Sequence, residues 1–79
     1  MNNKRSDIEL AWRKQFGDRL KRLIRINGMT QGEFAAVLDI QEASLSRYIT
    51  GVSSPSPYRV KQMADALGCD IALFFDDNF

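Results

Sequence analysis

The stretch "TQGEFAAVLDIQEASLSRYITG", residues 30–51, holds two short amphipathic segments separated by about two residues. The first four letters, "TQGE", are a capping box, in which the Thr30 hydroxyl accepts from the amide of Glu33 and the Glu33 side chain returns to the Thr30 backbone. A short turn follows at residues 39–40, and the apolar spacing then predicts a second helix over about residues 41–49. The stretch therefore predicts two helices joined by one tight turn.

The second of these helices has two contrasting faces. Leu45, Tyr48 and Ile49 are spaced three and four residues apart, which puts them on one apolar face. The other face carries small hydroxyl residues and a single long cation, Arg47, before Gly51 ends the helix. Because a solvated helix face usually mixes Glu and Lys, we interpret this face as one built to lie close to a partner.

Similar start and stop signals divide the rest of the chain into three more predicted helices. "SDIE" is another capping box, which predicts that a long first helix begins at Ser6 and ends near Gly28. Ser56 with Pro57 begins a fourth helix, and Asp70 caps a short last one. The first helix carries an apolar stripe that steps by three or four residues through Ile8, Trp12, Phe16, Leu20, Leu23 and Ile24. We therefore expect an all-α fold, a compact bundle of five helices with an extended first helix.

Composition excludes several classes of protein. With 79 residues, 44% of them hydrophobic, the chain is expected to form one small domain. Cys69 is the only cysteine and histidine is absent, which excludes a disulfide framework, a thiolate metal cluster and histidine-based catalysis. Carboxylate pairs such as Asp76 and Asp77 lack a metal-binding spacing, so we expect neither an enzyme nor a cofactor. Apolar runs are short and the N-terminus has no apolar signal region, so we expect an intracellular protein without a membrane segment.

Charge is distributed unevenly along the chain. The net charge is only +1, but residues 1–25 carry eight basic and three acidic side chains, a balance of +5. Residues 62–79 carry four acidic side chains and no basic one. Such asymmetry indicates a polyanionic partner at one end of the chain, although a solvated helix face explains the charge alone at least as well.

Four segments carry a resemblance to a known family: "MTQGEFA", "LDIQEASLSRY", the "TG" that ends the third helix, and "ADALGCDIALFF". With them the chain resembles the lambda-repressor-like, Cro-type helix-turn-helix family of DNA-binding regulators over residues 16–75. Three positions depart from the family pattern. Asp39 stands where a Gly is usual, Gln41 where a Ser or Thr often caps the recognition helix, and Glu42 puts an acid at the start of that helix.

The resemblance implies a third helix that enters the DNA major groove with its N-terminal residues at the base edges. Arg47 would reach a guanine edge or a phosphate, and Gln31 would hold a phosphate at a helix start or support a base-reading residue. Glu42 stays open between accepting a hydrogen bond from cytosine and simply suiting the helix dipole. The cluster Lys21–Arg22–Arg25 is equally open between phosphate contact and a solvated face. The residues carried over as DNA-binding are Gln31, Glu42, Ala43, Ser44, Arg47, Thr50 and Ser53.

The sequence thus predicts three parts and one function. Residues 1–15 extend the first helix, residues 16–75 form the DNA-binding domain with its motif at about 30–50, and residues 76–79 are a short acidic and aromatic tail. The expected function is that of a cytoplasmic, nucleoid-associated regulator of bacterial or phage type, a repressor or controller that binds a double-stranded DNA operator. The alternative is an antitoxin-like or protein-protein interaction module, whose partner would be a toxin or another regulator.

A homodimer is also predicted, because one recognition helix reads too few base pairs to find a single site. Its surface is expected to use apolar residues left over from the core, namely Phe74, Phe75, Phe79 and Leu10. The C-terminal helix is the favoured contact because it is acidic and would lie away from DNA. In the opposing interpretation, Ile8 and Trp12 fold over the C-terminal phenylalanines of the same subunit and leave only a weak dimer.

Overall fold

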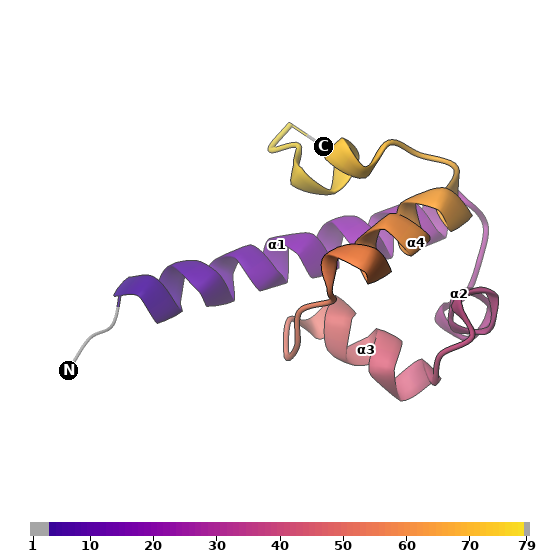
Figure 1. Cartoon of the computed structure of the whole chain (residues 1–79), viewed down its shortest axis with the longest axis horizontal. Coiled ribbons are helices and arrows are strands. Elements are labelled where there is room, and N and C mark those ends of the chain that lie inside the picture. The colour runs from indigo at the N-terminus through magenta and orange to yellow at the C-terminus, as the bar shows by residue number, and fades with distance from the viewer. Residues whose placement is uncertain (1–3, 79) are drawn as a thin grey trace.

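The computed structural model describes residues 4–78, with side chains from residue 6 onward. Over that range the chain forms four α-helices and a short 3₁₀ helix, and it contains no strand. The elements are α1 (Lys4–Ile26), α2 (Gln31–Leu38), α3 (Glu42–Thr50), α4 (Pro57–Leu67) and η1 (Ile71–Phe75), as Figure 1 shows. The all-α prediction is confirmed.

Two details of the prediction are wrong. α1 begins at Lys4, so Ser6 lies inside the helix and "SDIE" does not start it. Lys and Arg are good helix formers, which lets the helix continue outward past the capping signal. The last element is a 3₁₀ helix of five residues rather than a fifth α-helix, with the amide of Leu73 donating to the carbonyl of Asp70 at 3.0 Å. The 3₁₀ winding occurs in short pieces, and a segment this short can adopt it in place of an α-helix.

The predicted caps between the helices are confirmed. The amide of Glu33 donates to Thr30 Oγ1 at 3.1 Å, and the amide of Thr30 donates to Glu33 Oε1 at 2.8 Å. Hydrogen bonding to the Glu33 carboxylate, first from the backbone amide of Thr30 and then from its side chain, favours the ionised form and lowers the pKa of Glu33. Ser56 and Asp70 likewise cap α4 and η1 through their side chains. Gly28, Gly51 and Gly68 end their helices with positive φ.

Asp39 ends α2 in the same left-handed conformation as those glycines. Its φ of 56° is the only positive value of a non-glycine residue among those described. Asp is one of the few side chains that tolerate this conformation. The departure from the family Gly at this position therefore keeps the backbone geometry that a Gly would adopt.

The core lies where α1, α2, α3, α4 and η1 meet. Among the described residues, thirteen apolar side chains form it, including the fully buried Phe16, Leu20, Phe34, Leu38, Leu45, Met63 and Phe74. Cys69 packs against this cluster, where burial and the neighbouring carboxylate of Asp70 raise the pKa of its thiol. No helix of the described part is long and apolar enough to cross a membrane.

α1 and α3 pack unusually closely at their crossing. A Cβ at Gly17 would overlap the backbone carbonyl oxygen of Ile49, so only glycine fits there. A Cβ at Gly51 would lie 3.1 Å from the Lys14 side chain. The C-terminal end of α3 is therefore held directly on the middle of α1.

The C-terminal segment covers the opposite side of α1, which is visible in Figure 1 as the yellow turns above the helix. Phe74 stacks on Phe16 with ring centroids 5.1 Å apart, and Phe75 stacks on Trp12 at 5.9 Å. Phe74 is fully buried, so the expectation that it is left over from the core is wrong. The intramolecular packing of Trp12 on a C-terminal phenylalanine, predicted as the opposing interpretation, is present. Phe79 lies outside the described residues.

Candidate nucleic-acid interface

α3 keeps its apolar face in the core and turns a face of small residues outward. Leu45 is fully buried and Ile49 packs against the core, whereas Ala43, Arg47 and Thr50 are exposed. At about 100° per residue these three exposed residues share one side of the helix. The small side chains let this face approach a surface closely, and the long side chain of Arg47 can make one polar contact further from the helix.

Glu42 bridges the first turns of α2 and α3. Its Oε1 would lie 3.1 Å from a Cβ added to Gly32, so the carboxylate rests on the N-terminal turn of α2. It also belongs to the first turn of α3, whose cap residue Gln41 makes no side-chain cap bond. Both helix termini attract a negative charge. This placement favours the dipole interpretation of Glu42 over base recognition.

Gln31 lies beside two cations of α1. It is half-buried and lines a surface hollow of about 170 Å³ together with Lys21, Ile24, Arg25 and Met29. The amides of a helix start and two basic side chains thus meet at one place, which is the combination that binds phosphate. The prediction for Gln31 remains a prediction with this added geometry.

A second hollow joins α1 to the end of α3. Lys14, Asp18, Lys21, Ile49 and Thr50 line it, and its volume is about 370 Å³. Lys21 lines both hollows, so the two lie on either side of it along α1.

Lys14, Lys21 and Arg25 form a straight row on α1, which we call the basic stripe. Their spacing of seven and four residues keeps them within about 40° of one another over about 16 Å of helix. Within the described residues none of the three makes a hydrogen bond or ion pair. Their charges therefore remain available to a polyanion. The sequence prediction missed Lys14, although the helical period alone aligns it with the other two.

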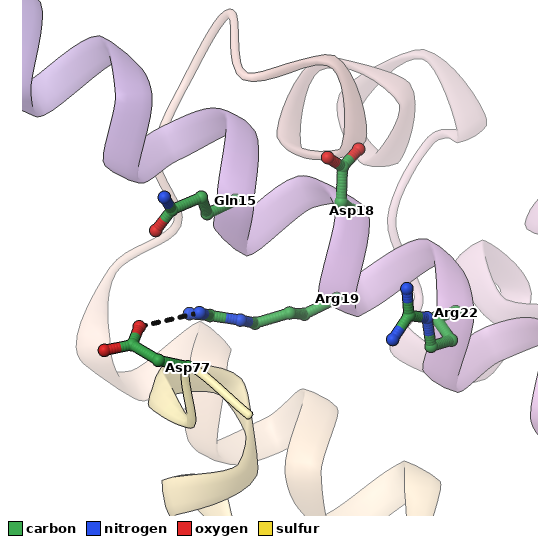
Figure 2. A pocket seen from close by; sticks show the side chains of 5 residues that line it. All are labelled: Gln15, Asp18, Arg19, Arg22 and Asp77. Carbon is green, nitrogen blue, oxygen red and sulfur yellow. Dashed lines mark hydrogen bonds and ion pairs between the residues drawn. The ribbon is translucent and has the colours of Figure 1, made fainter. Parts of the chain in front are cut away.

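The neighbouring cations Arg19 and Arg22 lie on another side of α1. Figure 2 shows Arg19 extending to Asp77 of the C-terminal segment, and Arg22 further along α1; both line one hollow with Gln15, Asp18 and Asp77. Arg19 donates to the carbonyl oxygen of Phe74 at 2.9 Å and to Asp77 Oδ1 at 3.0 Å. The predicted cluster Lys21–Arg22–Arg25 is thus divided between two sides of the helix.

Thr50 and Ser53 are already engaged in the backbone that ends α3. The Thr50 hydroxyl donates to the carbonyl oxygen of Ser46 at 2.9 Å, so its proton is used within the helix. The amides of Val52 and Ser53 donate to the carbonyl oxygen of Arg47 at 3.0 and 3.2 Å. Ser44 is half-buried at the first turn of α3. Contact of these residues with DNA stays a prediction.

This geometry defines a helix-turn-helix protein, with α2 and α3 joined by a tight turn. Residues 20–74 match the model of the helix-turn-helix family HTH_3. The chain belongs to this family, which confirms the resemblance seen in the sequence. Family membership supports DNA binding and transcription regulation and points away from an enzyme.

Solved structures share the fold. The chain is similar to an HTH_3 family transcriptional regulator from Vibrio cholerae, with a TM-score of 0.77 and 24% identity, over 85% of this chain and 38% of that one. It is also similar to the clp gene regulator ClgR from C. glutamicum, with a TM-score of 0.76 and 23% identity, over 81% and 83% of the two chains. The chain thus spans well under half of the Vibrio cholerae protein. A search of curated protein sequences found no match.

Proposed function

We propose that the protein is a sequence-specific regulator that binds double-stranded DNA, with α3 in the major groove and the basic stripe on the phosphates. The observation that carries the proposal is the alignment of three unpaired cations with Gln31 at one end and Thr50 at the other. An α-helix with small outward side chains fits the major groove. A cation row of about 16 Å beside it can follow the backbone that borders the groove.

Specificity in this proposal comes mainly from Arg47. It is exposed on the outward face of α3, where it can donate two hydrogen bonds to a guanine edge. Glu42 orients the start of α3 against α2. Its negative charge also disfavours misplaced contacts of α3 with DNA. The bound protein would regulate transcription by occlusion of an operator or by recruitment to it. It would act in the cytoplasm, at the nucleoid, as two copies on a two-fold site.

The resemblance to transcription regulators supports this function, since both similar solved structures are described as regulators. A module that used its surface for a protein partner alone, such as a toxin, and not for DNA would show no sequence preference among duplexes. Its DNA affinity would also depend little on Arg47.

The test is selection of bound duplexes from a random pool, followed by titration of Arg47→Ala. We expect a loss of about 1–3 kcal/mol on the selected site and relaxed preference at one base pair per half-site. Arg22→Ala is the matched control, because that arginine lies by the C-terminal segment. Failure to select any duplex would exclude the proposal, and equal weakening on all sequences would reduce Arg47 to a phosphate contact.

A further inference from the structure

The turn between α2 and α3 is held from outside by two side chains of α4. Gln62 Nε2 donates to the carbonyl oxygen of Leu38, the last residue of α2, at 3.3 Å. Arg59 Nη1 donates to the other end of the same amide, Gln62 Oε1, at 2.8 Å. Both bonds are partly buried, and we call this chain of two bonds the polar relay.

Each bond of the polar relay supports the other. A guanidinium group only donates hydrogen bonds, so Arg59 requires the oxygen of the Gln62 amide on its side. The nitrogen of that amide is then turned toward Leu38, whose carbonyl oxygen only accepts. Reversal of the amide would lose both bonds. The relay therefore fixes one orientation of Gln62 and couples the first turn of α4 to the end of α2.

The turn between α2 and α3 needs such support because its own sequence stabilises it weakly. Asp39 has a φ of 56° and a ψ of 46°, a conformation that is less favourable for an L-residue than for glycine. Gln41, the cap residue of α3, makes no side-chain cap bond. The backbone bonds that close the turn use the carbonyl oxygens of Ala35 and Ala36. The carbonyl oxygen of Leu38 is left to the relay.

The two ends of α3 are held by different neighbours. Its C-terminal end rests on α1, where a Cβ at Gly17 would overlap the carbonyl oxygen of Ile49. Its N-terminal end continues directly from the turn, and the amides of Ser44 and Leu45 donate to the carbonyl oxygen of Gln41 at 3.0 and 3.2 Å. α4 packs against α2, so the relay reaches α3 through the end of α2. It therefore acts on the end of α3 that the proposed function brings to the base edges.

We propose that Gln62 and Arg59 are positioning residues for sequence recognition, which fix the N-terminal end of α3 without contacting DNA. The inference rests on the proposed function and deepens it, by naming the side chains that decide how well one site is distinguished from another. Contacts to base edges carry sequence information and phosphate contacts do not. A binding group must also be held to about 0.5 Å by the side chains that support it. Loss of the relay should therefore reduce discrimination between sites more than general affinity for DNA.

The first test is amide hydrogen exchange, followed by NMR, in wild type and Gln62→Met. Met has nearly the length and helix propensity of Gln but lacks its amide, and the half-buried site should accept it, which circular dichroism would verify. The amides of Ser44 and Leu45 should exchange about three- to tenfold faster, the range that one hydrogen bond spans. The amides of Gly51 and Val52, at the other end of α3, should be unchanged. Equal acceleration at both ends, or none at either, would overturn the inference.

The second test measures discrimination, the ratio of the affinities for a duplex selected from the random pool and for the same duplex with one base pair changed. Gln62→Met should lower this ratio about three- to tenfold and leave the salt slope unchanged, since no phosphate contact is removed. Gln62→Glu keeps an acceptor for Arg59 but loses the donor to Leu38, so it should lower the ratio as well. Lys61→Gln is the matched control, because it changes the net charge by the same amount at the adjacent residue, whose ion pair with Asp65 is exposed. It should leave the ratio unchanged.

A double-substitution cycle tests the part of Arg59. Because Arg59 acts through the amide of Gln62, the variant that combines Arg59→Met with Gln62→Met should lose no more discrimination than Gln62→Met alone. Additive losses would overturn the relay. A salt slope that falls by about one unit in Arg59→Met would also overturn it, because Arg59 would then contact a phosphate directly.

The outcomes separate this inference from the proposed function. Discrimination that is unchanged in Gln62→Met, or affinity that falls equally on all duplexes, would overturn the positioning role while wild type still selects a site. A wild type that selects no duplex would exclude the proposed function, and the role of the relay in recognition with it. That result is obtained with wild type alone, whereas failure of the relay is seen only in the variants.

Discussion

The two sides of α1 carry the same kinds of residue but use them differently. On the side facing α3, Gly17 brings two backbones together, and the cations of the basic stripe make no hydrogen bond or ion pair with the described residues. On the side facing the C-terminal segment, Trp12 and Phe16 stack on phenylalanines and Arg19 binds the end of the chain. Both sides therefore hold the fold together, but the cations are bonded within the chain only on the side of the C-terminal segment.

The difference shows that the position of a cation around a helix decides its role more than its position in the sequence. Arg19 and Lys21 are two residues apart, yet they lie about 160° apart around the helix. The side chain of Arg19 is only 12% exposed and bonds a backbone carbonyl 55 residues away. Lys21 lies exposed between two hollows on the other side.

The largest effect should come from removing the close approach on the α3 side. Gly17→Ala adds a Cβ that overlaps the Ile49 carbonyl, and backbone cannot move aside cheaply. We expect a loss of about 3 kcal/mol in the free energy of unfolding, despite the better helix propensity of Ala. Urea unfolding measures this loss, and DNA binding should fall with it because α3 rests on that contact.

Gly32→Ala is the matched control for this substitution. Its Cβ would lie 3.1 Å from the end of the Glu42 side chain, which can move. We expect unchanged or slightly raised stability, by up to about 1 kcal/mol from helix propensity. If Gly17→Ala were as stable as Gly32→Ala, the crossing of α1 and α3 would have to be looser than described.

A smaller effect is expected from the other side of α1. Arg19→Gln removes a charge-assisted bond to the carbonyl of Phe74 from a nearly buried side chain, and should cost about 1–2 kcal/mol in unfolding free energy. Asp77→Asn removes only an ion pair whose acid is 93% exposed, so it should change stability by less than about 0.5 kcal/mol. Equal losses in the two variants would show that the ion pair, rather than the carbonyl bond, holds the segment. The DNA affinity of Arg19→Gln, measured where the protein is folded, should stay near wild type.

Substitutions in the basic stripe should lower DNA affinity and leave stability unchanged. Lys14→Gln, Lys21→Gln and Arg25→Gln should leave the unfolding free energy within about 0.5 kcal/mol of wild type, since none of these cations has a hydrogen-bond or ion-pair partner in the part of the chain that the structure describes. Each should lower the salt slope of DNA affinity by about one unit. Arg22→Gln, on the other side, is the control and should change the slope less. Asp18→Asn should raise affinity, because its carboxylate lines the hollow between Lys14 and Lys21.

Local signals in the sequence predicted most of the fold. The caps at Thr30, Ser56 and Asp70 depend on residues two or three positions away, so the sequence contains all that forms them. The same reasoning misplaced the start of α1 at Ser6, because a capping box signals a possible start and cannot prevent a helix from continuing. The five-residue η1 was too short for its winding to be predicted.

Long-range contacts account for what the sequence did not predict. Whether Phe74 or Phe75 enters the core depends on how η1 meets α1, which no local pattern specifies. The bond from Arg19 to Phe74 joins opposite ends of the chain and left no signal in the sequence. Lys14, in contrast, could have been found from the helical period. The DNA-binding residues taken from the resemblance remain predictions, to which the structure adds exposure and neighbours.

The smallest expected effect on stability concerns the capping box at the start of α2. This box lies next to Gln31, at one end of the basic stripe. Hydrogen bonds from Thr30 lower the pKa of Glu33 below its ordinary value of 4.5. A carboxylate whose pKa is lower in the folded chain stabilises the fold fully when the pH is above its pKa in the unfolded chain. This stabilisation is lost as the pH falls through its pKa in the folded chain.

Glu33→Gln keeps a side-chain oxygen that can accept from the Thr30 amide but cannot titrate. We therefore expect wild type to be slightly more stable than Glu33→Gln at neutral pH, and the two to converge as the pH is lowered below about 4.5. Thermal unfolding of both proteins across this range measures the difference, which is small because the carboxylate is exposed. A constant difference at all values of pH would mean that Glu33 acts through packing or propensity and that its charge contributes nothing to the start of α2.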